Sequence, residues 1–137
     1  MLAGTMSRTD KGRVAPPPVL EAAAQRVADA VAALPGVVAQ AHWEIGSQTE
    51  VNGVDFYVGE HEVGHIHLDG EAHIAIGAAL GKALIERKLA TRFRWSSEFV
   101  VVDTADHARA LAIFGLRHAQ IDGVATRELR ARIAALR

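Results

Sequence analysis

Residues 59 to 76 constrain the fold of this chain most, because short runs of alternating character flank the dipeptide Asp69-Gly70. Glycine accepts the positive φ angle that tight hairpin turns require, so the stretch predicts a β-hairpin. Successive side chains of a strand point to opposite faces of the sheet. Several even-numbered positions are apolar, namely Ile66, Leu68, Ala72, Ile74 and Ile76. The odd-numbered positions His61, His65, His67, Glu71 and His73 are polar.

The length of the hairpin loop decides which side chains share a face. A three-residue loop, Leu68-Asp69-Gly70 with Gly70 left-handed, keeps the apolar set inward and pairs His65 with His73 and His67 with Glu71. A two-residue Asp69-Gly70 turn would instead send His73 to the other face. We therefore expect the three-residue loop and a histidine-rich face opposite the core.

The remaining pattern predicts an α+β fold, an antiparallel β-sheet with helices packed mainly on one face. Residues 1–15 lack periodicity and suggest a flexible leader before Pro16-Pro17-Pro18, and residues 16–137 suit a single domain. Asp103 or Thr104 is expected to cap the late helix, and Asn52-Gly53 to form a turn. The expected helices cover 19–34, 79–88 and the stretch from this cap to 121, and a last helix carries Leu129, Ile133 and Leu136 on one stripe. The further strands cover 37–45, 54–58 and 99–102, and residues 91–95 form either a short strand or an ordered loop.

The net charge and the cysteine content restrict which partners and metal ligands are expected. The net charge of -1 offers no general attraction to nucleic acid or to an anionic membrane, so neither is expected as a partner. The chain has no cysteine, so any transition-metal site must use His, Asp or Glu. This composition fits the reducing cytoplasm, and the first 18 residues lack the apolar run of a signal peptide.

The stretch His61-Glu62-Val63-Gly64-His65 matches the HExxH pattern of zinc peptidases. That chemistry requires a helix, which brings residues four apart onto one face. Glycines at 59, 64 and 70 disfavour a helix here. On a strand, four residues span about 13 Å, so the two histidines could not bind one ion. We therefore do not expect a zinc peptidase.

His65-Ile66-His67 is a better candidate, because strand residues two apart point the same way at a spacing of about 6.6 Å. With His73 they could hold a divalent metal and activate a bound water. Glu62 has the parity of the core and is expected at the rim of the sheet, or buried with a partner such as an arginine. The candidate ligand-binding residues are Glu62, Gly64, His65, His67 and His73.

Residues 53–116 resemble the family of small luciferase-domain proteins through Gly59, Glu62-Val63-Gly64-His65-Ile66-His67 and the apolar run to Ile76. In some relatives the second hairpin strand is similar to His73-Ile74-Ala75-Ile76, and in others an aspartate replaces the histidine. A Gly-Trp segment of the relatives is altered here to Arg94-Trp95-Ser96-Ser97-Glu98. The resemblance directs attention to Glu62, Gly64, His65 and His67, and it implies neither light emission nor flavin chemistry.

Three functions stay open from the sequence. The leading hypothesis is a domain that binds a small molecule or an anion at the histidine-rich face. The alternatives are a non-catalytic interaction module without a pocket and a metal-dependent enzyme with histidine ligands. The sequence does not identify a cofactor: these residues could hold a divalent metal, and the chain has no flavin or nucleotide motif.

Overall fold

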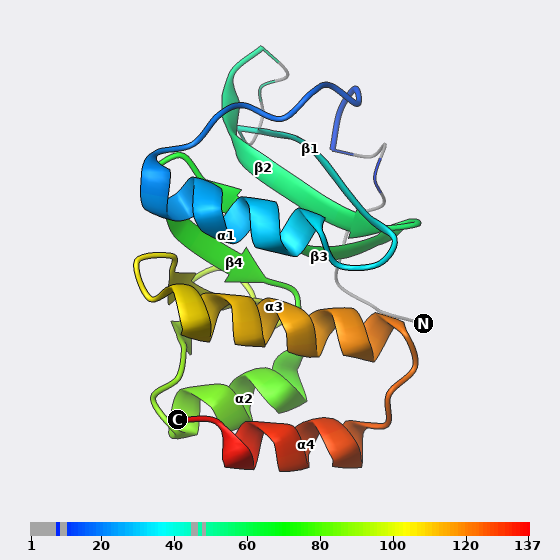
Figure 1. Ribbon diagram of the computed structural model, residues 1–137, viewed down its shortest axis with the longest axis vertical. Helices are drawn as coiled ribbons and strands as arrows, with labels where there is room; N and C mark the ends of the chain where they lie inside the picture. Colours follow the sequence, from blue (N-terminus) through cyan, green and yellow to red (C-terminus); the bar gives the residue numbers. More distant parts are fainter. Residues whose placement is uncertain (1–7, 9–10, 45–46, 48) are drawn as a thin grey trace.

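The computed structural model describes residues 8, 11–44, 47 and 49–137. In this part of the chain, six antiparallel strands form one sheet in the order β1-β2-β3-β4-β6-β5. The α+β class predicted from the sequence is confirmed (Figure 1). The elements are α1 (Ala22–Ala32), β1 (Val37–Trp43), β2 (Val51–Val58), β3 (His61–His67), β4 (Glu71–Ile74), α2 (Ala78–Glu86), β5 (Thr91–Arg92), β6 (Val100–Asp103), α3 (His107–Ile121) and α4 (Thr126–Ala135).

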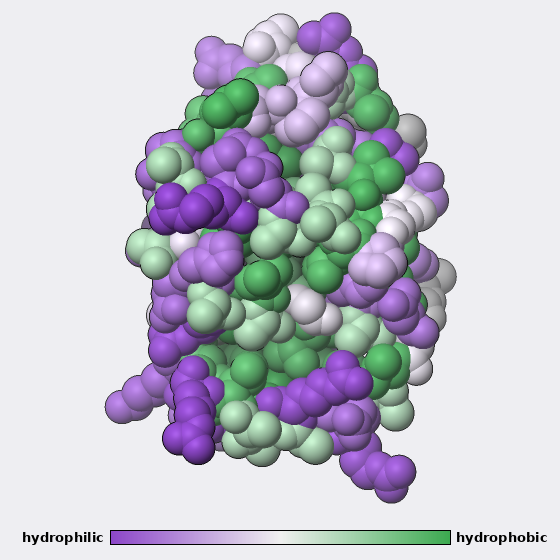
Figure 2. All heavy atoms as spheres, viewed as in Figure 1, coloured by the Kyte–Doolittle hydropathy of each residue, from purple (hydrophilic) through white to green (hydrophobic). Residues whose placement is uncertain are grey.

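Helices α1 and α3 lie against one face of the sheet (Figure 1). The buried stripe of α1 consists of Ala24, Val27, Ala28 and Val31, which recur at helical spacing. From α3, the Phe114 ring meets the Phe56 ring of β2 edge-to-face, with centroids 5.7 Å apart. The outer surface of this helical layer mixes hydrophilic and hydrophobic residues (Figure 2). The core therefore lies between these helices and the sheet.

The central hairpin has the register expected from the sequence. Gly70 has a φ of 90° in the loop between β3 and β4, and His65 pairs with His73. The apolar residues Ile66, Ala72, Ile74 and Ile76 are buried, as expected. Leu68 is 47% exposed, so its expected inward position is wrong. Leu68 belongs to the loop, beyond the last pair of the ladder.

Other boundaries differ from the expectations. Asn52-Gly53 lies within β2 and forms no turn. A Cβ atom on Gly53 would be 2.0 Å from Ile66 O, so glycine is required there by the close approach of β3. Asp106 caps α3 through Arg109 N, whereas Thr104 donates its hydroxyl hydrogen bond to Gly70 O at 2.6 Å. Ile45, expected at the end of the first strand, lies outside the described residues.

The N-terminal segment contacts the sheet where it is described. Ala15 O accepts a hydrogen bond from Ala41 N at 2.9 Å, and Trp43 Nε1 donates to Arg13 O at 3.0 Å. Residues 1–7, 9 and 10 of the expected leader lie outside the described residues. Gln40 and His42 are buried although they have the polar parity of β1, so the second half of that strand is covered on both faces. Across the described residues, no helix is long and apolar enough to cross a bilayer.

Candidate functional site

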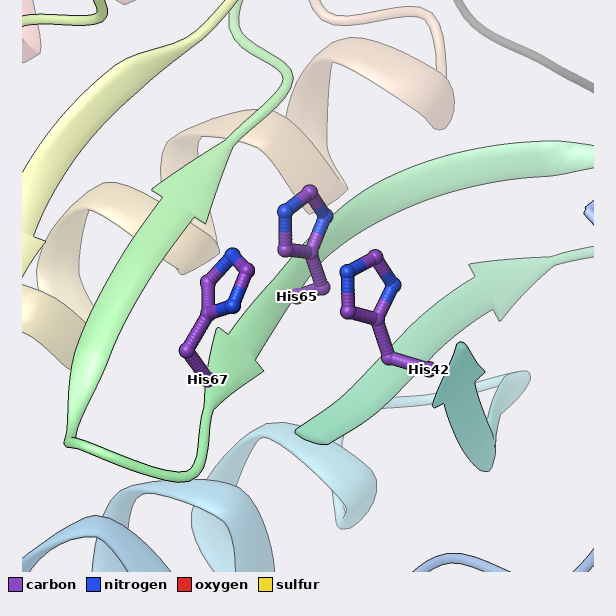
Figure 3. A group of neighbouring side chains, drawn as sticks. All are labelled: His42, His65 and His67. Atoms are coloured by element: carbon purple, nitrogen blue, oxygen red, sulfur yellow. The ribbon is translucent and has the colours of Figure 1, made fainter. Parts of the chain in front are cut away.

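Two rows of residues cross the sheet and place polar side chains together. Asp55 of β2 pairs with His65 of β3, which pairs with His73 of β4. Gly53 of β2 pairs with His42 on one side and with His67 on the other. Partners in adjacent strands point to the same face. Figure 3 shows His42, His65 and His67 on the side of the sheet that faces away from the helices.

Because Gly53 has no side chain, the histidines that flank it on β1 and β3 can contact each other. The rings of His42 and His67 lie edge-to-face with centroids 5.1 Å apart. The rings of His42 and His65 stack with centroids 4.2 Å apart and planes 10° apart. His73 approaches from the other side, with its Nδ1 atom 3.1 Å from His65 Nε2 and 3.2 Å from His67 Nε2. We call His42, His65, His67 and His73 the histidine cluster.

A β-bulge brings Glu62 to the histidine cluster. Phe56 pairs with Gly64 and Tyr57 with Glu62, which leaves Val63 as an extra residue in β3. Val63 joins the core, while Glu62 Oε2 lies 2.7 Å from His65 Nδ1. Glu62 is fully buried, so the expected position at the rim is wrong. The alternative expectation was burial beside a partner such as an arginine; Arg117 lies close by, but it donates a hydrogen bond to the main-chain oxygen of Glu62, at 2.9 Å.

Three imidazoles of the cluster each contact a carboxylate. His42 Nδ1 lies 2.8 Å from Asp55 Oδ1, and His73 Nε2 lies 2.7 Å from Glu71 Oε1, in addition to the contact between His65 and Glu62. An ionised carboxylate only accepts hydrogen bonds, so each imidazole must carry its proton on the contacting nitrogen. The tautomers inferred from this network leave lone pairs on His42 Nε2, His65 Nε2 and His73 Nδ1.

Burial governs the charge of His65 and His67. It lowers the pKa of His65 to about 4, although the hydrogen bond to Glu62 opposes this shift. Burial, together with the neighbouring imidazoles, lowers the pKa of His67 to about 3. For Glu62 burial alone would raise the pKa, but the contacts with His65 and Lys11 outweigh it and lower the pKa to about 2. At neutral pH the site therefore combines the neutral imidazoles of His65 and His67 with an ionised Glu62.

Lys11 provides a cation on the same face. Its Nζ atom lies 2.8 Å from Glu62 Oε1 and 3.1 Å from Asp55 Oδ1, and both carboxylates are buried. The other oxygen of Asp55, Oδ2, is buried and has no hydrogen-bond partner among the described residues. One ammonium thus faces two buried carboxylates, and part of their acceptor capacity is unused.

A pocket of about 470 Å³ opens over the histidine cluster. Phe93 and Phe99 form an aromatic wall, with the Phe93 ring centroid 4.6 Å from that of His73 and 5.7 Å from that of Phe99. Trp95 also lines the pocket and is 73% exposed. The lining residues are Lys11, His42, Glu44, Asn52, Glu62, His65, His67, His73, Phe93, Trp95 and Phe99.

Four of the five candidate residues from the sequence meet in this pocket, namely Glu62, His65, His67 and His73. Gly64 lies on the opposite face, where an added Cβ atom would be 2.9 Å from Phe114 Cε1. Its place in the fold is explained by the packing of α3 rather than by contact with a ligand. His61, the first histidine of the HExxH match, is exposed on a strand, so a zinc-peptidase helix is absent at these residues.

Sequence reasoning missed His42, Asp55, Lys11 and the aromatic wall. Asp55 carried a usable signal, because it is the one acidic residue inside the apolar run 54–58. His42 had no comparable signal, since its position depends on how β1 pairs with β2 across the intervening connection.

The family model described as the Luciferase domain matches residues 60–116. The resemblance predicted from the sequence is therefore confirmed for this part of the chain. The matched range contains Glu62, His65, His67, His73 and the aromatic wall, whereas Lys11, His42 and Asp55 precede it. No curated protein and no solved structure matches the chain.

Proposed function

We propose that this protein binds a small, partly apolar molecule in the pocket over the histidine cluster. The observation that carries the proposal is the pocket itself, about 470 Å³ in volume, with an aromatic wall on one side and imidazoles on the other. Ligand sites in proteins combine apolar surface with a few convergent polar groups in this way. A molecule with a planar apolar body and one polar end would match both sides.

Trp95 supports this assignment. A large aromatic side chain that is 73% exposed offers apolar area which the free protein does not bury. Arg94 lies over its ring, 4.7 Å from the centroid, and helps to hold its orientation. Since Trp95 lines the pocket, a bound ligand could cover its ring, and removing this apolar surface from water would favour binding.

A free anion is the less favoured ligand at neutral pH. The lowered pKa values of His65 and His67 keep both imidazoles uncharged, and Glu62 brings a negative charge to the lining. Lys11 is engaged by two carboxylates. An anion would therefore meet little positive charge, unless a bound cation supplied it.

The two alternatives are weighed by the same geometry. A non-catalytic interaction module would be favoured by an open or flat surface at His65 and His67, and the hollow over them weighs against it. A metal-dependent enzyme needs a bound ion, for which the imidazoles of the histidine cluster are the candidate ligands. We further propose a cytoplasmic location, because a chain without cysteine has no need of an oxidising compartment. Neither nucleic acid nor a membrane is proposed as a partner.

The test is a thermal-shift screen of small aromatic and heteroaromatic compounds in buffer containing EDTA. A ligand that binds only the native state raises the midpoint by mass action. Compounds that stabilise the wild type should stabilise Trp95→Ala less, since that variant removes pocket surface. Leu68→Ala is the matched control, because it shortens an exposed apolar residue that does not line the pocket.

Saturation-transfer NMR would then identify which edge of each stabilising compound contacts the protein. Hits whose effect is equal in wild type and in Trp95→Ala, or a screen without hits, would contradict the proposed pocket function. Binding that is lost in Trp95→Ala and kept in Leu68→Ala would support it.

A further inference from the structure

The tautomers of the histidine cluster leave lone pairs that face one another. His65 Nε2 and His73 Nδ1 are 3.1 Å apart, and in the neutral form of each ring this nitrogen lacks a proton because the other ring nitrogen contacts a carboxylate. Two acceptors at this distance repel unless a cation or a proton lies between them. His67 can donate one proton to His73 from Nε2 at 3.2 Å, but it cannot also satisfy His65 and His42.

The spacing of the nitrogens suits a metal ion. His42, His65 and His67 each offer one ring nitrogen, and these three atoms lie within 4.8 Å of one another. The contacts of His73 are shorter, at 3.1 and 3.2 Å. Ligands that bind one tetrahedral zinc ion at about 2.0 to 2.1 Å are roughly 3.3 Å apart. The contacts of His73 with His65 and His67 are therefore already close to this spacing, whereas His42 must reorient before its nitrogen can bind the same ion.

The carboxylates around the cluster match the usual surroundings of metal-binding imidazoles. A histidine ligand generally donates its other N–H to a carboxylate, which fixes the ring and makes the free nitrogen more basic. Here Asp55, Glu62 and Glu71 contact His42, His65 and His73 in that manner. Lys11 offsets only part of this negative charge. A divalent cation is therefore favoured by charge as well as by geometry.

We infer that the histidine cluster binds one divalent transition-metal ion, with His65 and His67 as central ligands and His42 and His73 completing the set. This deepens the proposed function, because the ion would lie in the floor of the same pocket and could hold the polar end of the ligand. Imidazole ligands suit zinc, cobalt, nickel, copper and iron. His42 must turn its ring, since nearly parallel planes cannot aim their lone pairs at one point.

The experiment is a titration of EDTA-treated, dialysed protein with CoCl₂, followed by absorption between 500 and 700 nm, and with ZnCl₂, followed by calorimetry. Variants His67→Gln, His73→Gln and His42→Gln change one imidazole each. His61→Ala is the matched control, because it removes an exposed histidine from the same strand. Circular dichroism establishes that each variant is folded, and His67→Gln is the safest of them because His67 is only partly buried.

The wild type and His61→Ala should bind one equivalent of cobalt or zinc. His67→Gln should lose at least tenfold in affinity, and a deletion of a carboxylate partner such as Glu71→Ala should cost 10- to 100-fold, the range typical of outer-shell partners. Absence of stoichiometric binding by the folded wild type, or equal affinity in wild type and folded His67→Gln, would overturn the inference. Neither result depends on the aromatic compounds, whose binding is measured in EDTA.

Discussion

Glu62 and His65 are three residues apart on one strand, yet their side chains meet at 2.7 Å. In a regular strand, residues at odd separation point to opposite faces. The extra residue Val63 reverses the parity between them, so one bulge places a carboxylate beside an imidazole and a valine in the core. The site therefore depends on an irregularity of β3 as much as on the histidines.

Replacing Glu62 by alanine should lower the free energy of unfolding by about 1–3 kcal/mol, because His65 and Lys11 would lose a buried partner. Glu62→Gln should cost less, since the amide can still accept one hydrogen bond. Urea denaturation measures both. Glu86→Gln, an exposed change at the end of α2, is the control. Stabilities of Glu62→Ala and Glu86→Gln that agree within error would contradict the buried contact.

Gly64→Ala should also destabilise the protein, by about 1–3 kcal/mol, because the new Cβ atom would lie 2.6 Å from His73 O and 2.9 Å from Phe114 Cε1. Gly115→Ala is the matched control on α3, where an added Cβ atom meets nothing within 4 Å. That variant should gain up to about 1 kcal/mol from helix propensity. A neutral Gly64→Ala would show that Gly64 is not needed for packing.

Lys11→Met should remove the cation that faces Asp55 and Glu62. Two buried carboxylates would then repel each other, so the midpoint of urea unfolding should fall. Lys82→Met, an exposed change on α2, serves as the control. If Lys11→Met and Lys82→Met unfold at the same urea concentration, the N-terminal segment does not stabilise the site.

Acidification should destabilise the protein in EDTA. The pKa of His65 falls from 6.5 to about 4 on folding and that of His67 from 6.5 to about 3, so the unfolded chain binds protons more readily. Stability is therefore lost progressively as the pH falls below about 6.5. Glu62, whose pKa falls from 4.5 to about 2, extends the loss to lower pH.

Urea midpoints at pH 7.5, 6.0, 5.0 and 4.0 measure this dependence. His67→Gln should show a smaller loss between pH 6.5 and 4, because one of the responsible groups is absent. A midpoint that stays constant from pH 7.5 to 5.0 would show that these imidazoles are not held neutral by folding.

The sequence predicted the hairpin correctly because the signals for it are local. Gly70 permits the left-handed loop conformation, and the alternation of Ile66, Ala72 and Ile74 fixes the register that pairs His65 with His73. The α+β class likewise follows from local periodicities.

The parts that were not predicted depend on contacts between distant segments. The bulge at Val63 moves Glu62 from the expected core face to the face of the histidine cluster. The alternation of apolar and polar residues alone cannot reveal such an extra residue. His42 reaches the cluster only through the pairing of β1 with β2, and Lys11 only through the path of the N-terminal segment. Sequence separation therefore limits which site residues can be predicted: those near the hairpin loop were identified, and those from distant segments of the chain were not.

Carboxylates fix the tautomers of His65 and His73 and leave lone pairs that converge in the pocket. Long-range ¹H–¹⁵N correlation spectra of the imidazoles, recorded in EDTA at pH 7.5, measure this directly. We predict a protonated Nδ1 and an unprotonated Nε2 for His65, the reverse for His73, and large shifts of both unprotonated nitrogens after one equivalent of ZnCl₂. A protonated Nε2 on His65, or spectra that zinc leaves unchanged, would contradict the account.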